Sequence, residues 1–438
     1  MRDKLKQYFE ISIQPVKVLG TYICLFAAAC ILLILANMLP SERIRSNIWV
    51  STSDFIREGN YPYMGIEETS YALDNWTEAV LLSFYYTADC TRPVYSAFIA
   101  SAYQPDNSTG VERLELLVED ANWEQSPHIL NRSSYWLGYG IFLRPLLLFF
   151  DYSTCRMLLN VASYALLVIV IVIMTKRLGG HDAIGFGITL TAFNYYLLSL
   201  QYTLGIFSVF VMYAAILYIL YNKAKINYFY FMFIVGIFAA YFEWFSIPLI
   251  TFGLPVLVSL QQIRKKDINC PFAQYFNTVF QSGIGWSVGY GIMVISKVFA
   301  AMSVVGMEAW SYFRERLTDD SSTMQIRDFI KSVLQLIRCV FPFNMIDNDW
   351  VLTIVIGLIL LFWIIMILGY KKNRDYNMII LIVAFAPLAW YFVFKGHIGH
   401  VGIEYRTLMI SYYAGWIFLV TCFDSVKDWF QKGIKSET

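Results

Sequence analysis

The sequence predicts an all-α integral membrane protein that crosses the bilayer about ten times. Of its 438 residues, 58% are hydrophobic and only 15% are charged, whereas a soluble domain carries about 25% charged residues. Uncharged stretches of about 20 residues, the length of a membrane-crossing helix, recur along the chain. Lysines and arginines gather in every second connection between these stretches, a pattern typical of a polytopic membrane protein.

The predicted spans form a single membrane domain, residues 1–438. They cover residues 19–40, 155–175, 183–200, 203–221, 227–246, 248–262, 275–299, 350–369, 377–394 and 407–423. The sixth is short and begins at Pro248. The first is too long for a secretory signal peptide and lacks a small-residue cleavage site, so we expect it to remain as a helix.

The basic residues of the short connections predict the orientation, because cytoplasmic loops carry an excess of Lys and Arg. With ten spans, these residues fall on one side: Arg2, Lys4, Lys6, Lys17, Lys176, Arg177, Lys223, Lys225, Arg264, Lys265, Lys266, Lys371, Lys372, Arg374, Lys427, Lys432 and Lys435. We therefore expect both termini in the cytoplasm, and the plasma (inner) membrane of a bacterium as the location. Membrane lipids are expected partners. Nucleic acid is not, because no basic patch of the binding kind is present.

Two long connections face the other side. Residues 41–134, rich in acidic side chains, form the first extracytoplasmic loop, and residues 300–349 form the second. In the second loop, apolar residues recur at helical spacing on one face: Ile326, Phe329, Ile330, Val333, Leu334, Ile337 and Val340. This pattern predicts an amphipathic helix lying in the outer interface.

The apolar segment 135–150 is predicted not to cross the membrane. Arg144 and Pro145 stand in its middle, and counting it as a span would invert every later loop. We expect an interfacial or re-entrant segment that enters from outside, with its backbone covered by protein or lining a cavity.

Two carboxylates in the first loop are candidate catalytic groups. Asp74 fits a helix N-cap, and Glu78 follows it at i+4, so both side chains lie on one helix face. One hypothesis is a general base directed at a cavity above the membrane. The alternative, which spacing alone favours, is a cap followed by a solvated helix face.

Three charged residues fall in apolar stretches, where a charge needs a partner or a function. Glu243 and Lys297 lie near the outer ends of the fifth and seventh predicted spans. Lys297 either reaches the interface or takes part in a site, and Glu243 either forms a structural ion pair, for example with Lys297, or acts in a site. The Arg144 guanidinium needs an anion or carbonyl groups around it.

The loop KGHIGHVGIEYR, residues 395–406, places up to four donors at the outer face. These are Lys395, His397, His400 and Arg406. Zinc would need a further ligand such as Glu404, so capture of an anion is the favoured interpretation and a divalent metal the alternative. If this loop meets segment 135–150, then Arg144, Lys297, His397, His400 and Arg406 form a basic pocket at the depth of a lipid phosphate.

The cysteines show no metal-binding spacing. Cys90, Cys155 and Cys339 fall on the predicted outer side, where one disulfide could form between an undetermined pair. Asn75, Asn107 and Asn131 begin glycosylation sequons, which would matter only in a secretory pathway.

The layout resembles the GT-C superfamily of membrane glycosyltransferases: one N-terminal span, a long outer loop with acidic residues at a helix start, many further spans and a second outer interfacial helix. The segments DNWTEAVLL, YWLGYGIFLRPLLLFF, YFEWFSIPLI, WSVGYGIMVISK and HIGHVGIEYR also look like motifs of a poorly characterised group of bacterial multipass proteins. No WWDYG-like motif is present, so an oligosaccharyltransferase is not indicated.

The resemblance implies an inverting sugar transfer from a polyprenyl-phosphate donor to a glycan or lipid acceptor of the cell envelope. Asp74 would be the base, with Glu78 or the pair Glu67 and Glu68 as alternatives. Arg406 and the basic residues above would hold the donor phosphate, and Tyr405 of the YR motif is a further candidate for the site. Tyr135, Trp136 and Tyr139 would either stack on sugar rings or anchor at the interface.

Other functions remain open at this point. A flippase or transporter of lipid-linked sugars would need charged residues along the bilayer midplane, whereas the polar groups here gather at one face. A polysaccharide polymerase or ligase would share the outer site and differ in its donor, a pyrophosphate-linked oligosaccharide. A non-enzymatic assembly factor is the third alternative.

Overall fold

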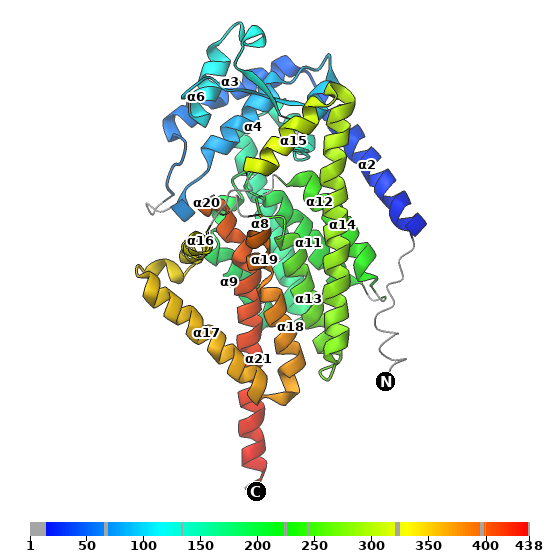
Figure 1. Ribbon diagram of the computed structural model, residues 1–438, viewed down its shortest axis with the longest axis vertical. Coiled ribbons are helices and arrows are strands. Elements are labelled where there is room, and N and C mark those ends of the chain that lie inside the picture. Colours follow the sequence, from blue (N-terminus) through cyan, green and yellow to red (C-terminus); the bar gives the residue numbers. More distant parts are fainter. Residues whose placement is uncertain are drawn as a thin grey trace.

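The computed structural model describes residues 15–64, 69–132, 135–222, 224, 226–243, 246–319, 325–394, 398 and 400–436. Figure 1 shows a bundle of long helices with a cap of shorter helices at one end and the C-terminus at the other. The described chain is almost entirely helical, as the sequence predicts. The one departure is a small two-stranded sheet in the cap, which the sequence analysis missed.

The bundle contains twelve described helices, of which α10 and α19 are short. They are α2 (Pro15–Asn37), α8 (Tyr152–Arg177), α9 (Gly180–Ala192), α10 (Tyr195–Leu198), α11 (Ile206–Tyr221), α12 (Tyr228–Phe242), α13 (Ile250–Lys266), α14 (Phe272–Val305), α17 (Asp349–Gly369), α18 (Arg374–Ala384), α19 (Ala386–Val393) and α21 (Met409–Ser436). A 3-10 turn, η4 (Lys371–Asn373), joins α17 to α18.

Six described stretches are long and apolar enough to cross a membrane, which indicates an integral membrane protein. They are Pro15–Asn37, Tyr152–Arg177, Phe272–Val305, Asp349–Gly369, Arg374–Val393 and Val401–Asp424. The other four predicted spans correspond to shorter helices, α9, α11, α12 and α13, of 13, 16, 15 and 17 residues. Their lengths lie below the roughly 20 residues of an untilted span, so length alone supports six crossings rather than ten.

The cap is built mainly from residues 41–147. Its elements are α3 (Ser41–Glu58), η1 (Thr69–Tyr71), α4 (Asn75–Thr87), α5 (Pro93–Phe98), β1 (Ala100–Tyr103), α6 (Gly110–Glu119), η2 (Trp123–Gln125), β2 (Ile129–Arg132) and α7 (Gly140–Leu147). Strands β1 and β2 are antiparallel, with Ala100 opposite Arg132 and Tyr103 opposite Ile129. Helix α7, the only helix in segment 135–150, has eight residues, about 12 Å, and is too short to cross the hydrocarbon core.

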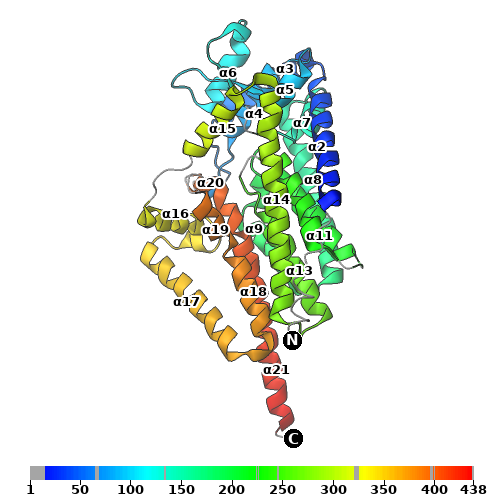
Figure 2. The same ribbon diagram turned by 45° about the vertical axis from the view of Figure 1, so that its right-hand side comes forward.

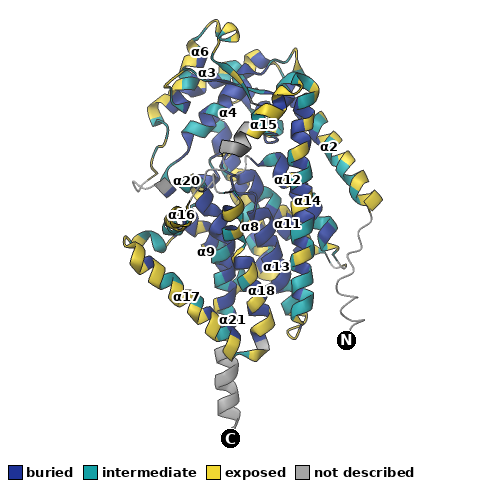
Figure 3. Ribbon diagram, in the orientation of Figure 1, coloured by how far each residue is buried: buried dark blue, intermediate teal, exposed yellow. Residues whose placement is uncertain are grey.

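The second outer loop adds α15 (Glu308–Asp319), α16 (Ile326–Arg338) and η3 (Phe343–Met345). Helix α16 lies across the bundle axis (Figures 1 and 2). Leu336 is buried and Phe329, Val333 and Ile337 pack against the core, whereas Ile326 and Ile330 stay exposed. Exposed residues also line α2 and α17 (Figure 3), and such apolar faces suit contact with lipid.

Close backbone packing holds α12 against α14. A Cβ atom on Gly289 would lie 2.0 Å from the Phe233 carbonyl oxygen, and one on Gly285 would lie 2.2 Å from the Phe229 carbonyl oxygen. The two glycines form a Gly-x-x-x-Gly pair, which lets membrane helices approach closely. Gly291 on the same helix has open space.

Several basic flanks of the predicted cytoplasmic side meet at the end of the bundle away from the cap. The Lys265 ammonium donates to the carbonyls of Arg177 and Leu178, both at 2.9 Å. The Arg264 guanidinium donates to the Thr421 hydroxyl at 2.8 Å and reaches Asn373 at 3.5 Å. The ends of α8 and α13 are therefore joined to each other, and α13 is also joined to η4 and to the middle of α21.

Candidate functional site

Asp74 begins α4 and is the helix N-cap that the sequence predicts. Its Oδ1 accepts a hydrogen bond from the Thr77 N–H at 2.9 Å, and its Oδ2 accepts one from the Thr77 hydroxyl at 2.6 Å. The residue is 9% exposed. Burial raises the pKa of the carboxyl above its usual 3.8, while the Thr77 hydrogen bonds and the charges of His400 and Arg406 oppose that rise. The cap is confirmed, and the charges of two basic side chains of the C-terminal loop act on the carboxylate.

Tyr405 joins the C-terminal loop to the cap. The loop continues from α20 (Val401–Glu404) into the 3-10 turn η6 (Tyr405–Leu408). The Tyr405 hydroxyl lies 3.4 Å from the Ser70 carbonyl oxygen and 3.3 Å from that of Phe193. The Asn194 amide donates to both Ser70 and Tyr405, at 2.8 and 3.3 Å. Residues separated by more than 300 positions thus meet beside the start of α4.

Arg406 is fully buried at this junction. Its Nη1 donates to the Gly402 carbonyl at 2.9 Å, and its guanidinium carbon lies 4.9 Å from the Tyr405 ring centroid. Its Nε and Nη2 have no hydrogen-bond partner among the described residues. A buried guanidinium with unused donors is costly, because each unsatisfied polar group loses its hydration. These atoms are therefore suited to receive an anion.

Glu78 lies one turn after Asp74 but has different surroundings. Its Oε1 accepts hydrogen bonds from the Thr203 N–H at 2.7 Å and from the Thr203 hydroxyl, and its Oε2 accepts one from the Tyr202 N–H at 3.2 Å. The side chain is 0% exposed. Burial raises its pKa to about 6, opposed chiefly by the charge of Arg156. These contacts support a positioning role for Glu78, which ties α4 to the connection before α11.

A polar network beside Glu78 was missed by the sequence analysis. Arg156 donates to Glu58 at 3.3 Å and to the Asn75 side-chain oxygen at 2.6 Å, and the Asn75 amide donates to Glu58 at 3.0 Å. Gln201, which precedes the Glu78-binding segment, is fully buried with no partner among the described residues for either amide atom. The available signal was Arg156 itself, a charge at the start of an apolar stretch.

Arg144 and Lys297 have structural partners elsewhere in the protein. The Arg144 Nε donates to the Ala36 carbonyl at 2.9 Å and its Nη1 reaches the Tyr85 carbonyl at 3.5 Å. The Lys297 ammonium donates to the Phe98 carbonyl at 2.7 Å. Carbonyl groups thus accept from two of the three guanidinium nitrogens of Arg144, whereas its Nη2 has no hydrogen-bond partner among the described residues. Within the described residues, no hydrogen bond or ion pair connects either side chain to Asp74. His397 lies outside the described residues, so the five-residue basic pocket stays a prediction.

The remaining predicted aromatic and acidic residues are mostly buried in packing. Trp136 is 2% exposed and donates to the Met293 carbonyl at 2.8 Å. Tyr135 is half-buried beside Lys297. Glu243 accepts hydrogen bonds from the Ser208 hydroxyl and from the Ser246 N–H at 3.1 Å. Among the described ion pairs, none joins Glu243 to Lys297.

An apolar groove of about 720 Å³ leads to the junction. It runs between α17 and the helices α18, α19 and α21, and its lining includes Phe193 and Leu408. The Phe193 ring is stacked on Tyr405, with centroids 5.8 Å apart and an angle of 13° between the planes, and Leu408 follows Arg406 by two residues. One end of this groove is therefore next to the Asp74–Arg406 junction.

Four predicted site residues, Glu67, Glu68, Lys395 and His397, lie outside the described residues. In the rest of the chain, no group of three or more His, Cys, Asp or Glu side chains is arranged to hold a metal ion. All seven cysteines are free, including Cys90, Cys155 and Cys339, so the structure contains no disulfide between them.

Comparison with known proteins gives no assignment: no protein-family model, no curated protein and no solved structure matches this chain. The function must therefore be inferred from the site itself.

Proposed function

We propose that the protein is a GT-C-like glycosyltransferase that moves a sugar from a polyprenyl-phosphate donor to an envelope glycan or lipid. One observation carries the proposal. The buried Arg406 guanidinium has two donor atoms unused among the described residues, its charge acts on the Asp74 carboxyl, and an apolar groove reaches Phe193 and Leu408 beside it. An amphiphilic donor needs a cation for its phosphate, a groove for its chain and a base for its acceptor.

In this proposal, Asp74 takes the proton of the acceptor hydroxyl. The acceptor oxygen attacks the anomeric carbon from the face opposite the phosphate, and the bond between that carbon and the phosphate oxygen breaks. The electron pair leaves with the phosphate, where Arg406 and His400 stabilise the developing charge. The attack inverts the anomeric centre.

The environment of Asp74 suits this role. Burial raises the pKa of the carboxyl, and a base with a higher pKa accepts the hydroxyl proton more readily. Glu78 instead holds two backbone N–H groups through its carboxylate, which leaves Asp74 as the better candidate of the two. Arg144, Lys297, Tyr135 and Trp136 remain outside the proposed donor site, because their contacts lie within the packing of the cap and bundle.

The proposal includes the ten-crossing topology, with the cap outside, both termini in the cytoplasm and the protein in the plasma membrane of a bacterium. The four short helices would then cross within the bundle, where neighbouring helices cover them and the bilayer is locally thinner. The gathering of basic flanks at the end away from the cap supports this orientation.

Donor binding tests the role of Arg406. The purified protein is titrated with a polyprenyl-phosphate sugar, and Arg406→Gln is compared with Arg264→Gln, a change of the same chemistry at the opposite end of the bundle. Loss of one charge-assisted phosphate contact, about 1.5–3 kcal/mol, weakens binding roughly tenfold to a hundredfold in Arg406→Gln only. Equal affinity in both variants would remove Arg406 from the donor site.

A transport assay in sealed vesicles distinguishes a glycosyltransferase from the main alternative, a flippase of lipid-linked sugars. A flippase would move the labelled donor between leaflets and leave the sugar attached to its lipid. Sugar release from the lipid, with no movement of intact donor, is the result that the glycosyltransferase proposal requires.

A further inference from the structure

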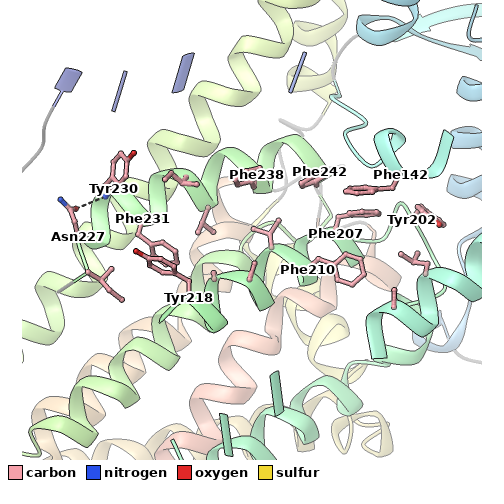
Figure 4. A pocket seen from close by; sticks show the side chains of 18 of the residues that line it. Phe142, Tyr202, Phe207, Phe210, Tyr218, Asn227, Tyr230, Phe231, Phe238 and Phe242 are labelled. Carbon is pink, nitrogen blue, oxygen red and sulfur yellow. Dashed lines mark hydrogen bonds between the residues drawn. The ribbon is translucent and has the colours of Figure 1, made fainter. Parts of the chain in front are cut away.

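A second and larger groove lies on another side of the bundle. Its volume is about 1060 Å³, and it is bounded by α2 and α12 on one side and by α8 and α11 on the other, with α7 at one end. Figure 4 shows its side chains, which run from Asn227 and Tyr230 to Phe142 and Tyr202. It is separate from the groove that leads to Arg406, since the two share no lining residue.

Stacked phenylalanines form much of one wall. Phe142 stacks on Phe207, Phe207 on Phe242 and Phe242 on Phe238, with ring centroids 5.6, 5.6 and 6.3 Å apart. From Tyr230 to Phe242 the groove follows twelve residue steps of α12, roughly 18 Å. One leaflet of the hydrocarbon core is about 15 Å thick. The apolar part is thus long enough for the acyl chain of a lipid in one leaflet.

The two ends of the groove differ in charge. At the Tyr202 end, the tyrosine hydroxyl donates to the Cys155 carbonyl at 3.1 Å, and the Tyr202 N–H binds the Glu78 carboxylate. An anionic headgroup would meet repulsion from Glu78 there. At the opposite end, the exposed Lys17 ammonium lies 4.3 Å from the Tyr230 ring centroid, and the Tyr230 hydroxyl shares a hydrogen bond with Thr21 at 2.6 Å.

The positive charge at the Lys17 end therefore favours a lipid with an anionic headgroup, and it favours placement of that headgroup at this end of the groove. We propose that this groove binds one phospholipid with an anionic headgroup, which lies at Lys17, while an acyl chain lies along the phenylalanine wall. The lipid belongs to the leaflet at the start of α2, away from the cap. It fills the space between α2 and the α8–α11–α12 face. The proposal does not depend on the glycosyltransferase activity.

Native mass spectrometry tests the occupant. The protein is purified from nanodiscs that contain phosphatidylcholine with or without phosphatidylglycerol, and retained lipid is identified. We expect one retained phosphatidylglycerol. Lys17→Gln should lower its retention about fivefold, the contribution of one lysine near an anionic surface, whereas Lys17→Arg should retain it. Equal retention of the two lipids, or of phosphatidylglycerol in the two variants, would overturn the proposal.

A matched pair of variants tests whether the lipid binds in this groove. Ala162 and Ala165 are both exposed residues of α8, and only Ala162 lines the groove. Ala162→Trp fills the groove and should remove the bound lipid, whereas Ala165→Trp should not. Unchanged retention in Ala162→Trp would place the lipid elsewhere. If Ala162→Trp fails to fold, the Lys17 variants decide the outcome, because Lys17 is exposed and its replacement leaves the core intact.

Discussion

Replacement of Glu78 separates a structural carboxylate from a catalytic one. Glu78→Ala removes the acceptor of the buried Tyr202 and Thr203 N–H groups. A buried N–H left without a partner costs about 1–3 kcal/mol, so the two together cost about 2–6 kcal/mol. Folded domains are stable by only about 5–15 kcal/mol. We therefore expect a markedly lower melting temperature of the purified protein in detergent.

Glu78 should also make the free energy of unfolding depend on pH. Burial raises the pKa of Glu78 from 4.5 to about 6, so folding favours the protonated form. The protonated Glu78 carboxyl therefore contributes stability to the folded protein that is fully present below pH 4.5 and is lost as the pH rises through 6. The difference in pKa corresponds to about 2 kcal/mol. Glu78→Gln should lack this component of the pH dependence.

Melting curves at pH values on either side of this range test both expectations. Glu119→Gln, the same chemical change at an exposed position of the cap, is the control and should melt like the wild type. If Glu78→Gln keeps the stability of the wild type at every pH and yet loses sugar transfer, Glu78 is catalytic and the structural role assigned to it is refuted.

Asp74→Asn should bind donor normally and lose turnover, because asparagine caps a helix as well as aspartate but cannot accept the hydroxyl proton; full turnover would move the base elsewhere. In His400→Gln, the pH below which the rate of sugar transfer falls should be higher than in the wild type, because the lost positive charge no longer lowers the pKa of Asp74. If that pH is unchanged or lower, the charge of His400 does not act on Asp74. Gly289→Ala should destabilise the protein by about 1–3 kcal/mol, because the added Cβ meets the Phe233 backbone. Gly291→Ala has open space, and thermal melting should show no loss in this control.

The general architecture could be predicted from the sequence because bilayer thickness and backbone hydrogen bonding restrict it strongly. The Asp74 cap was predictable for a local reason, since the side chain bonds to an N–H three residues away. The short helices were harder. The predicted span 183–200 is divided between α9 and α10 at Asn194, whose φ of 53° interrupts the helix, and hydropathy carries no information on that backbone angle.

The fold brings the C-terminal loop to the start of α4, although hundreds of residues separate them. The Tyr405 hydroxyl, next to Arg406, lies 3.4 Å from the carbonyl oxygen of Ser70, which precedes Asp74 by four residues. Arg144 and Lys297 donate hydrogen bonds to carbonyl groups at distant helix ends. Whether a buried cation meets an anion or a carbonyl depends on which helix ends pack beside it, and that is a tertiary property. The Arg156–Asn75–Glu58 network has the same origin.

Sugar release from a polyprenyl-phosphate donor by the purified protein is the most direct test of the proposed function. The wild type, given donor and envelope material as acceptor, should liberate polyprenyl phosphate and form a product of inverted anomeric configuration. Arg406→Gln and Asp74→Asn should both lose this reaction, while only Asp74→Asn binds donor with the affinity of the wild type. Donor that stays intact with the folded wild-type protein, or release that is unchanged in both variants, would contradict the proposal that these two residues form a glycosyltransferase site.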